Sequence, residues 1–228
     1  KRDDWSSSDE IIRSISSYQQ KFSQEIIPPP GKVKLEILLN KTDVFSRISK
    51  FYGLTGFVLL MLQFTGLVFA KLKLKIPVIT ATVFIIILFA IHSAGLVLRW
   101  YVSGHAPWSN GYEALIYIAW ATVLAGLVFA SRSSITLSAT SILAFLVLNT
   151  AHLSWMDPQI TNLVPVLKSY WLVIHVATIT ASYGFLALGS LLAFINLLLM
   201  SMQTTKTREY LYLTVKELTN TIEMTLII

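Results

Sequence analysis

Five long apolar runs, separated by short polar linkers, occupy most of the chain after residue 50. They cover residues 51–70, 76–98, 112–130, 135–151 and 171–202. A helix rises about 1.5 Å per residue, so runs of this kind are able to cross a hydrocarbon core of about 30 Å. The pattern therefore predicts an all-α fold, a polytopic membrane protein with about five transmembrane helices embedded in a lipid bilayer.

Residues 1–50 are polar instead, with nine Lys or Arg against seven Asp or Glu and a net charge of +2. A helical pattern runs from residue 8 to residue 22, the Pro-rich run 28–31 interrupts it, and an amphipathic piece at 33–45 leads to the membrane. Because so short a segment rarely buries a stable core, we interpret residues 1–50 as an extracytoplasmic tail of a larger domain plus this lead-in, rather than as an independent domain. Residues 51–228 then form the transmembrane bundle.

Basic residues alternate between the linkers. The linkers after the first, third and fifth runs are basic, whereas the other two carry only Arg99 and Lys168. By the positive-inside rule the basic linkers face the cytoplasm, so residues 99–111, residues 152–170 and the N-terminal segment are expected outside. The basic set consists of Lys71, Lys73, Lys75, Arg132, Lys206, Arg208 and Lys216.

Composition narrows the function classes. Apolar and aromatic residues make up 54% of the chain, charged residues only 13%, and the mean hydropathy is +0.65, which argues against a soluble domain. The net charge of +6 is explained by the topology signal, and no basic motif points to nucleic acid. The sequence has no cysteine, so this chain supplies no thiolate chemistry, and it has no phosphate-binding glycine motif.

Histidine is the residue type that could carry chemistry, because all four copies lie in an outward linker or the outer half of a run. His175 follows Trp171 by one helical turn, at a depth where a ligand is reachable from outside, although an interfacial histidine is also often structural. His92 lies deeper, where an ionisable group is a functional candidate by default. Its alternative is a neutral ring bonded to Ser93, to a neighbouring helix or to water.

The linker that joins the second and third runs has a structural explanation as well. Asn110 and Glu113 have the spacing of a helix cap, and the aromatic residues around His105 suit an interfacial belt. In the next outward linker, which begins at His152, Asp157 precedes a proline and is most simply a turn residue. No pair of residues here has the arrangement that hydrolysis requires.

Two stretches resemble a known family. The sequence RWYVSGHAPWSNGYEALIYIAW, from Arg99 to Trp120, and the sequence LVPVLKSYWLVIHV, from Leu163 to Val176, are similar to the cytochrome c biogenesis protein CcsA, the haem-handling half of the system II cytochrome c synthase. The N-terminal segment resembles the end of the CcsB part in fused CcsB–CcsA proteins. The resemblance covers most of the chain and is weakest over residues 1–50.

The resemblance implies a function. Members of the family carry haem outward, hold it between two external histidines and join its vinyl groups to the CXXCH cysteines of apocytochrome c. The first external histidine is matched by His175, which we expect to be an axial ligand of the haem iron, with Trp171 beside it. His92 and His105 are further candidates without an assigned role. The implied cofactor is haem b, and the implied partners are apocytochrome c and a CcsB-like domain fused upstream.

The resemblance also predicts a location and a limit. We expect a multi-pass protein of the bacterial inner (cytoplasmic) membrane with its N-terminal segment extracytoplasmic. The family's tryptophan-rich motif, WGxxWxWD, and its second external histidine are not in this sequence, so we expect a fragment whose haem lyase activity, if any, belongs to a longer protein. The alternatives are a transporter or permease subunit without covalent chemistry, with His92 and Arg99 in a polar pathway, and a purely structural assembly subunit.

Overall fold

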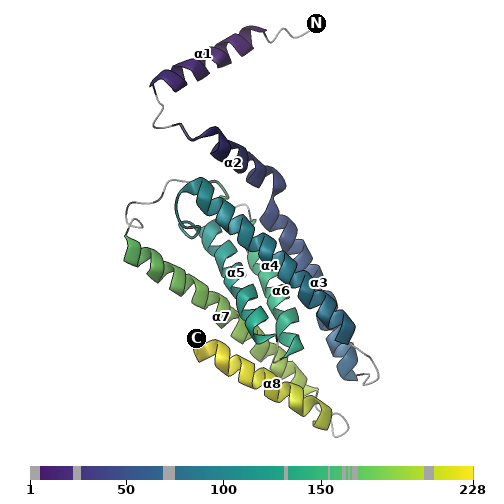
Figure 1. Cartoon of the computed structure of the whole chain (residues 1–228). Helices are drawn as coiled ribbons and strands as arrows, with labels where there is room; N and C mark the ends of the chain where they lie inside the picture. The colour runs from purple at the N-terminus through teal and green to yellow at the C-terminus, as the bar shows by residue number, and fades with distance from the viewer. Residues whose placement is uncertain are drawn as a thin grey trace.

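The computed structural model describes residues 6–22, 27–68, 75–130, 133–153, 155–160, 163, 165, 169–202 and 208–227. Within them the chain forms helices and no strands, as predicted (Figure 1). The helices are α1 Ser6–Phe22, α2 Pro30–Thr42, α3 Val44–Val68, α4 Lys75–Ser103, α5 Gly111–Phe129, α6 Ser134–Ala151, α7 Tyr170–Ser201 and α8 Arg208–Ile227.

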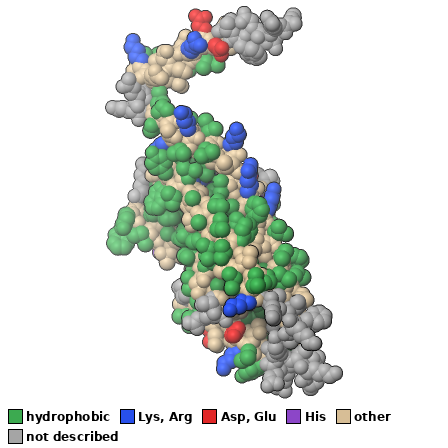
Figure 2. Space-filling model, turned by 45° about the vertical axis from the view of Figure 1, so that its right-hand side comes forward, with side chains coloured by type: hydrophobic (Ala, Val, Ile, Leu, Met, Phe, Trp, Pro, Cys, Tyr) green, Lys and Arg blue, Asp and Glu red, His purple; other side chains and the backbone are tan. Residues whose placement is uncertain are grey.

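Four stretches are helical, long and apolar enough to cross a membrane: Pro30–Gly66, Lys75–Ser103, Gly111–Phe129 and Tyr170–Ser201. The fifth predicted span is the shorter apolar helix α6. Figure 2 shows hydrophobic side chains over the middle of the molecule and Lys and Arg mostly toward its two ends. The prediction of a polytopic membrane fold is therefore confirmed.

The last three spans match the predicted limits to within one residue, whereas the first two are longer than their apolar runs. α3 begins at Val44 and α4 continues to Ser103, because the helical backbone extends past the apolar run into polar residues. Phe45 and Ile48, which precede the predicted boundary at residue 50, are buried in the core of the bundle. The division into two domains at this boundary stays a prediction.

Helix α8 is a feature that the sequence pattern did not reveal. Residues after 202 were expected to form a basic linker, but α8 packs against α7, with Leu218 buried and Asn196 Nδ2 donating a hydrogen bond to Thr219 Oγ1 at 3.0 Å (Figure 1). Arg208 and Lys216 therefore belong to a helix and not to a linker, and that expectation was wrong. The linker residues Lys71, Lys73, Arg132, Lys168 and Lys206 lie outside the described residues.

Helix α6 lies at the centre of the bundle, against α3, α5 and α7. Two of its buried hydroxyl groups donate hydrogen bonds: Thr140 Oγ1 to the Thr136 carbonyl on α6 at 2.7 Å, and Ser138 Oγ to Gln63 Oε1 on α3 at 2.7 Å. Such bonds satisfy polar side chains inside an apolar bundle. Glycine allows the close packing, since a Cβ atom at Gly126 would overlap the Thr140 side chain.

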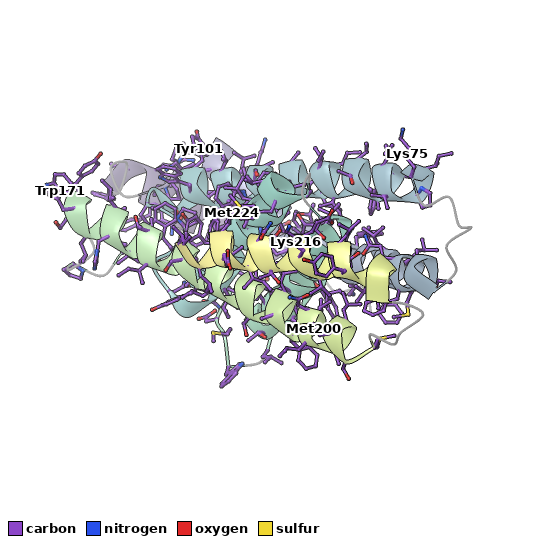
Figure 3. All side chains as sticks on the ribbon, turned by 90° about the horizontal axis from the view of Figure 1, so that it is seen from below. Lys75, Tyr101, Trp171, Met200, Lys216 and Met224 are labelled. Atoms are coloured by element: carbon purple, nitrogen blue, oxygen red, sulfur yellow. The ribbon has the colours of Figure 1, made fainter. Side chains whose placement is uncertain are left out.

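The linkers gather at two ends of the bundle. Residues 104–110 and 152–169 connect helices at one end, which we call the loop end, and α2 reaches the same end (Figure 1). In Figure 3, Tyr101 and Trp171 lie toward this end, whereas Lys75 and Met200 lie toward the other. This arrangement agrees with the predicted alternation of linkers. The compartment that each end faces stays a prediction.

The orientation is tested by labelling single cysteines in intact cells. We expect Ser103→Cys, at the loop end, to react with a membrane-impermeant thiol reagent, and Lys75→Cys, at the opposite end, to react only after the membrane is opened. The chain has no cysteine of its own, so the background is low. Labelling of Lys75→Cys but not of Ser103→Cys in intact cells would reverse the orientation.

Candidate functional site

The loop end is organised around a buried ion pair between the end of α4 and the start of α5. Arg99 Nε donates to Glu113 Oε1 at 2.8 Å, and the two side chains are only 3% and 0% exposed. Arg99 also donates from Nη1 to the Pro158 carbonyl at 2.9 Å and from Nη2 to the Gln159 carbonyl at 3.2 Å. One guanidinium therefore joins α4, α5 and the 152–169 loop.

The Glu113 carboxylate connects this pair to the 104–110 loop. Its second oxygen accepts hydrogen bonds from the Ser109 backbone N–H at 2.9 Å and from Ser109 Oγ at 2.6 Å. The predicted cap on α5 is half correct: Asn110 Oδ1 accepts from the Glu113 N–H at 2.8 Å, but the Glu113 side chain bonds to Ser109 and Arg99 instead. Sequence reasoning missed the ion pair.

The 152–169 loop meets the pair through a turn that the sequence did predict. Asp157 Oδ1 accepts a hydrogen bond from the Gln159 backbone N–H at 2.9 Å. Such a bond between an aspartate and the backbone two residues later stabilises a tight turn. The turn leaves two successive carbonyls, those of Pro158 and Gln159, available to the Arg99 guanidinium.

A pocket of about 540 Å³ lies at the loop end, between the 104–110 loop and the start of α7. Trp108 lines this pocket, and its ring lies 6.3 Å from that of Trp100 and 4.8 Å from that of Tyr117. Pockets of this size and mostly apolar character are typical of sites for small ligands. The lining residues are Trp100, Gly104, His105, Ala106, Trp108, Ser109, Leu163, Tyr170, Val173 and Ile174.

His175 lies on a different side of α7 from this pocket. Its ring is exposed, one turn after Trp171, which is 77% exposed and points away from the bundle in Figure 3. Within the part of the chain that the structure describes, His175 has no hydrogen-bond or ion-pair partner. His175 and Trp171 are thus both exposed one turn apart on α7, and a role of either residue in binding stays a prediction. Neither residue lines the pocket, although their neighbour Ile174 does.

His92 lies in the packed core, away from both the pocket and His175. The ring is fully buried, and its Nε2 lies 3.1 Å from the Ile116 carbonyl on α5. The rings of Phe45 and Tyr52 stand 5.6 and 6.2 Å away. These contacts match the structural alternative, in which the ring bonds to a neighbouring helix. A role of His92 in binding stays a prediction.

The two remaining histidines differ from His175 in having close partners. His105 lines the pocket, and its Nδ1 lies 3.2 Å from the Ala106 carbonyl. His152 Nδ1 lies 2.7 Å from the Leu148 carbonyl, while Nε2 is 3.6 Å from Asp43 Oδ1 and forms an ion pair when the ring is protonated. The structure thus brings three histidines to the loop end but does not bring them together.

The donor set at the loop end suits a metal that arrives with its own ligands. Among the described residues there is no group of three or more His, Cys, Asp or Glu side chains that could hold a free ion. Haem iron already has four nitrogen ligands from the macrocycle, so a single exposed imidazole such as His175 is sufficient for one axial position. The chemistry of the described residues is therefore compatible with haem.

Comparison with known proteins agrees with this picture. The chain is 45% identical to the protein NrfI of Wolinella succinogenes over 183 residues, which is 80% of this chain and 20% of NrfI. It is 39% identical over 120 residues to the cytochrome c biogenesis protein CcsA of Prochlorococcus marinus, which is 51% of this chain and 38% of that protein. A Synechococcus CcsA is 43% identical over 105 residues, or 44% of this chain and 33% of that protein.

The chain thus spans about a fifth of NrfI and about a third of these CcsA proteins. A family model described as cytochrome C assembly protein matches residues 108–228, which include α5, the 152–169 loop and all of α7. The match covers more than half of the chain and contains both Glu113 and His175. As the resemblance to CcsA predicted, the chain belongs to the cytochrome c assembly protein family.

Proposed function

We propose that this chain carries haem outward through the membrane and presents it at the loop end, with His175 as an axial ligand, for thioether attachment to the CXXCH motif of apocytochrome c. Family membership supports a role in cytochrome c biogenesis. The observation that favours His175 is its exposed imidazole at the start of α7, one turn from the exposed Trp171. A neutral imidazole in this position has a nitrogen to offer to the iron.

The proposed reaction requires this chain mainly to hold the reactants in position. Each thioether forms when a cysteine S–H adds across a vinyl C=C bond of haem, so no group leaves and no protein nucleophile is required. The sulfur atoms come from the cytochrome, which agrees with a chain that contains no cysteine. Holding the reactants in the correct orientation is itself a large contribution to the rate.

The finer assignments complete the proposal. The substrate is haem b, whose vinyl groups accept the cysteines, and its second axial ligand comes from outside this chain. The partners are apocytochrome c and a CcsB-like domain fused upstream, in the bacterial inner membrane with residues 1–50 outside. Because the chain spans only part of its relatives, we assign the complete reaction to a longer protein and expect this chain alone to be inactive.

The permease alternative is supported less well. It requires His92 and Arg99 to line a polar pathway, but His92 contacts the Ile116 carbonyl within an apolar cluster. Arg99 in turn has bonds from three nitrogens to its neighbours. Their contacts favour structural roles for both residues.

Substituting His175 tests the proposed function in the membrane protein that contains this chain. We expect His175→Ala to lower the haem bound per protein and the amount of matured cytochrome c by about tenfold or more, because one axial ligand is lost. Haem absorbance and matured cytochrome would be measured at equal amounts of membrane-inserted protein. His152→Ala is the matched control, since His152 lies at the same end but its ring already bonds to Leu148. Unchanged haem absorbance and maturation in His175→Ala would refute the assignment.

A further inference from the structure

The Arg99–Glu113 pair is an unusual feature for the interior of a membrane bundle. Both side chains are almost fully buried. The free-energy cost of moving two charged groups out of water often exceeds the gain from their mutual attraction. Replacing such a pair by apolar residues of similar volume often leaves the free energy of unfolding unchanged or raises it. Stability alone therefore does not explain the pair, whereas the segments that it connects suggest a role.

The pair connects the two loops at the loop end. Through Ser109 it holds the 104–110 loop, and through the Pro158 and Gln159 carbonyls it holds the turn at residues 157–159 of the other loop. The guanidinium also lies over the Tyr112 ring, with its central carbon 5.1 Å from the ring centre. Both oxygens of the carboxylate and three nitrogens of the guanidinium are used. A planar, forked donor is suited to hold several partners in one fixed geometry.

The 104–110 loop forms one wall of the 540 Å³ pocket, and the start of α7 forms another. Trp108 is the residue next to Ser109, so the bonds to Glu113 hold it where it packs on Tyr117 and faces α7. The 152–169 loop leads directly into α7, whose first residue, Tyr170, also lines the pocket. The ion pair thus holds the loop segment that carries Trp108 through Ser109, and it also binds the carbonyls of Pro158 and Gln159 in the second loop.

We propose that Arg99 and Glu113 are positioning residues that lock the two loops together and so set the aromatic wall at Trp108 against α7, beside the face that carries His175. This inference rests on the proposed haem function of that end. Neither residue contacts the haem. Their effect on it is transmitted through Ser109 to Trp108, which lines the pocket together with residues of α7.

The test separates positioning from stability in the membrane protein that contains this chain. Arg99→Met leaves the Glu113 carboxylate buried without its partner, so we expect little folded protein. The double variant Arg99→Met with Glu113→Leu removes both charges, and we expect it to insert and to unfold at nearly the temperature of the unsubstituted protein. Despite this recovery, its haem absorption band should shift and its yield of matured cytochrome should fall about tenfold.

A conservative variant and a control sharpen the result. Arg99→Lys keeps a positive charge beside Glu113 but loses the fork to Pro158 and Gln159, so we expect a folded protein whose haem band is also shifted. Ser138→Ala removes a buried hydrogen bond to Gln63 within the described bundle but touches neither loop, and it should leave the haem band unchanged.

A second measurement does not depend on haem. The Ser109 amide, bonded to Glu113, should exchange its hydrogen at least tenfold faster in the double variant than in the unsubstituted protein. Unchanged exchange would show that the loops are held by other contacts and would overturn the proposal.

A normal haem band and normal maturation in the double variant would also overturn the proposal, provided that His175→Ala loses both. Because exchange at Ser109 is read without haem, a silent His175→Ala would refute the haem assignment but not the link between the loops.

Discussion

Replacing Gly126 by alanine is expected to disrupt the contact between α5 and α6. The added methyl group would overlap the Thr140 side chain, which is buried on the central helix of the bundle. Overpacking of this kind costs typically about 1–3 kcal/mol, and here the clash involves several atoms of one side chain. Unfolding of the detergent-solubilised protein, followed by circular dichroism against temperature, would measure the loss.

Two other glycines provide matched comparisons. Adding Thr140→Gly to Gly126→Ala removes the obstructing side chain and should recover much of the lost stability. Gly56→Ala should resist such rescue by Ser141→Gly, since its Cβ would lie 2.9 Å from the backbone atoms Ile142 N and Ser138 O. Gly31→Ala meets open space and should not destabilise the protein. A Gly126→Ala variant as stable as Gly31→Ala would show that α5 and α6 separate easily.

The sequence predicted helix boundaries best where a helix is long and apolar enough to span a membrane. Apolar runs located α5, α6 and α7 to within a residue, because lipid and bundle both demand apolar side chains over the full length of a span. The same criterion failed for α8, which mixes threonine, asparagine and charged residues with leucine and isoleucine. Its contacts with α7 are partly polar, such as the bond from Asn196 to Thr219, and hydropathy does not register them.

Local spacing also predicted part of the candidate site. Trp171 and His175 share an exposed face because residues four apart lie one turn apart on a helix. The Asn110 cap and the Asp157 turn followed from short-range patterns as well. Each of these depends on residues within four positions of one another, a range over which backbone geometry fixes the contact.

The ion pair could not be predicted in this way, because its members come from distant segments. Arg99 is 14 residues from Glu113 and 59 residues from Pro158. A signal was nevertheless present: a lone arginine ends one span, and a lone glutamate begins the next across a short linker. Charges at membrane depth almost always pair with one another, so this arrangement favours an Arg–Glu pair.

His92 illustrates how a contact from a distant segment changes the interpretation of a histidine. Depth in an apolar run makes a histidine a functional candidate, but the Ile116 carbonyl on α5 gives this ring a partner that no local pattern reveals. Phe45 and Tyr52 then close around it from α3. The contrast between enclosed His92 and exposed His175 provides a stringent test of which ring meets haem.

Imidazole supplied from solution is expected to restore haem binding to His175→Gly. The substitution removes an exposed ring from the surface of α7, so under the proposed ligand role of His175 free imidazole should reach the axial position and replace the lost ligand. Membranes that contain the variant should therefore show weak haem absorbance without imidazole and a recovered band of the bis-imidazole type when it is added. Apocytochrome maturation should recover in parallel if the restored ligand also holds haem in place.

His92→Gly is the matched control, because it introduces the same residue at a buried position. Glycine lowers helix stability by about 1 kcal/mol relative to alanine in either variant. Its haem band should stay unchanged and should not respond to imidazole, although the empty volume beside Phe45 and Tyr52 should lower its thermal stability. Rescue of His92→Gly rather than His175→Gly would exchange the two roles. It would place the haem ligand inside the bundle and make the exposed face of α7 a surface for another helix or for lipid.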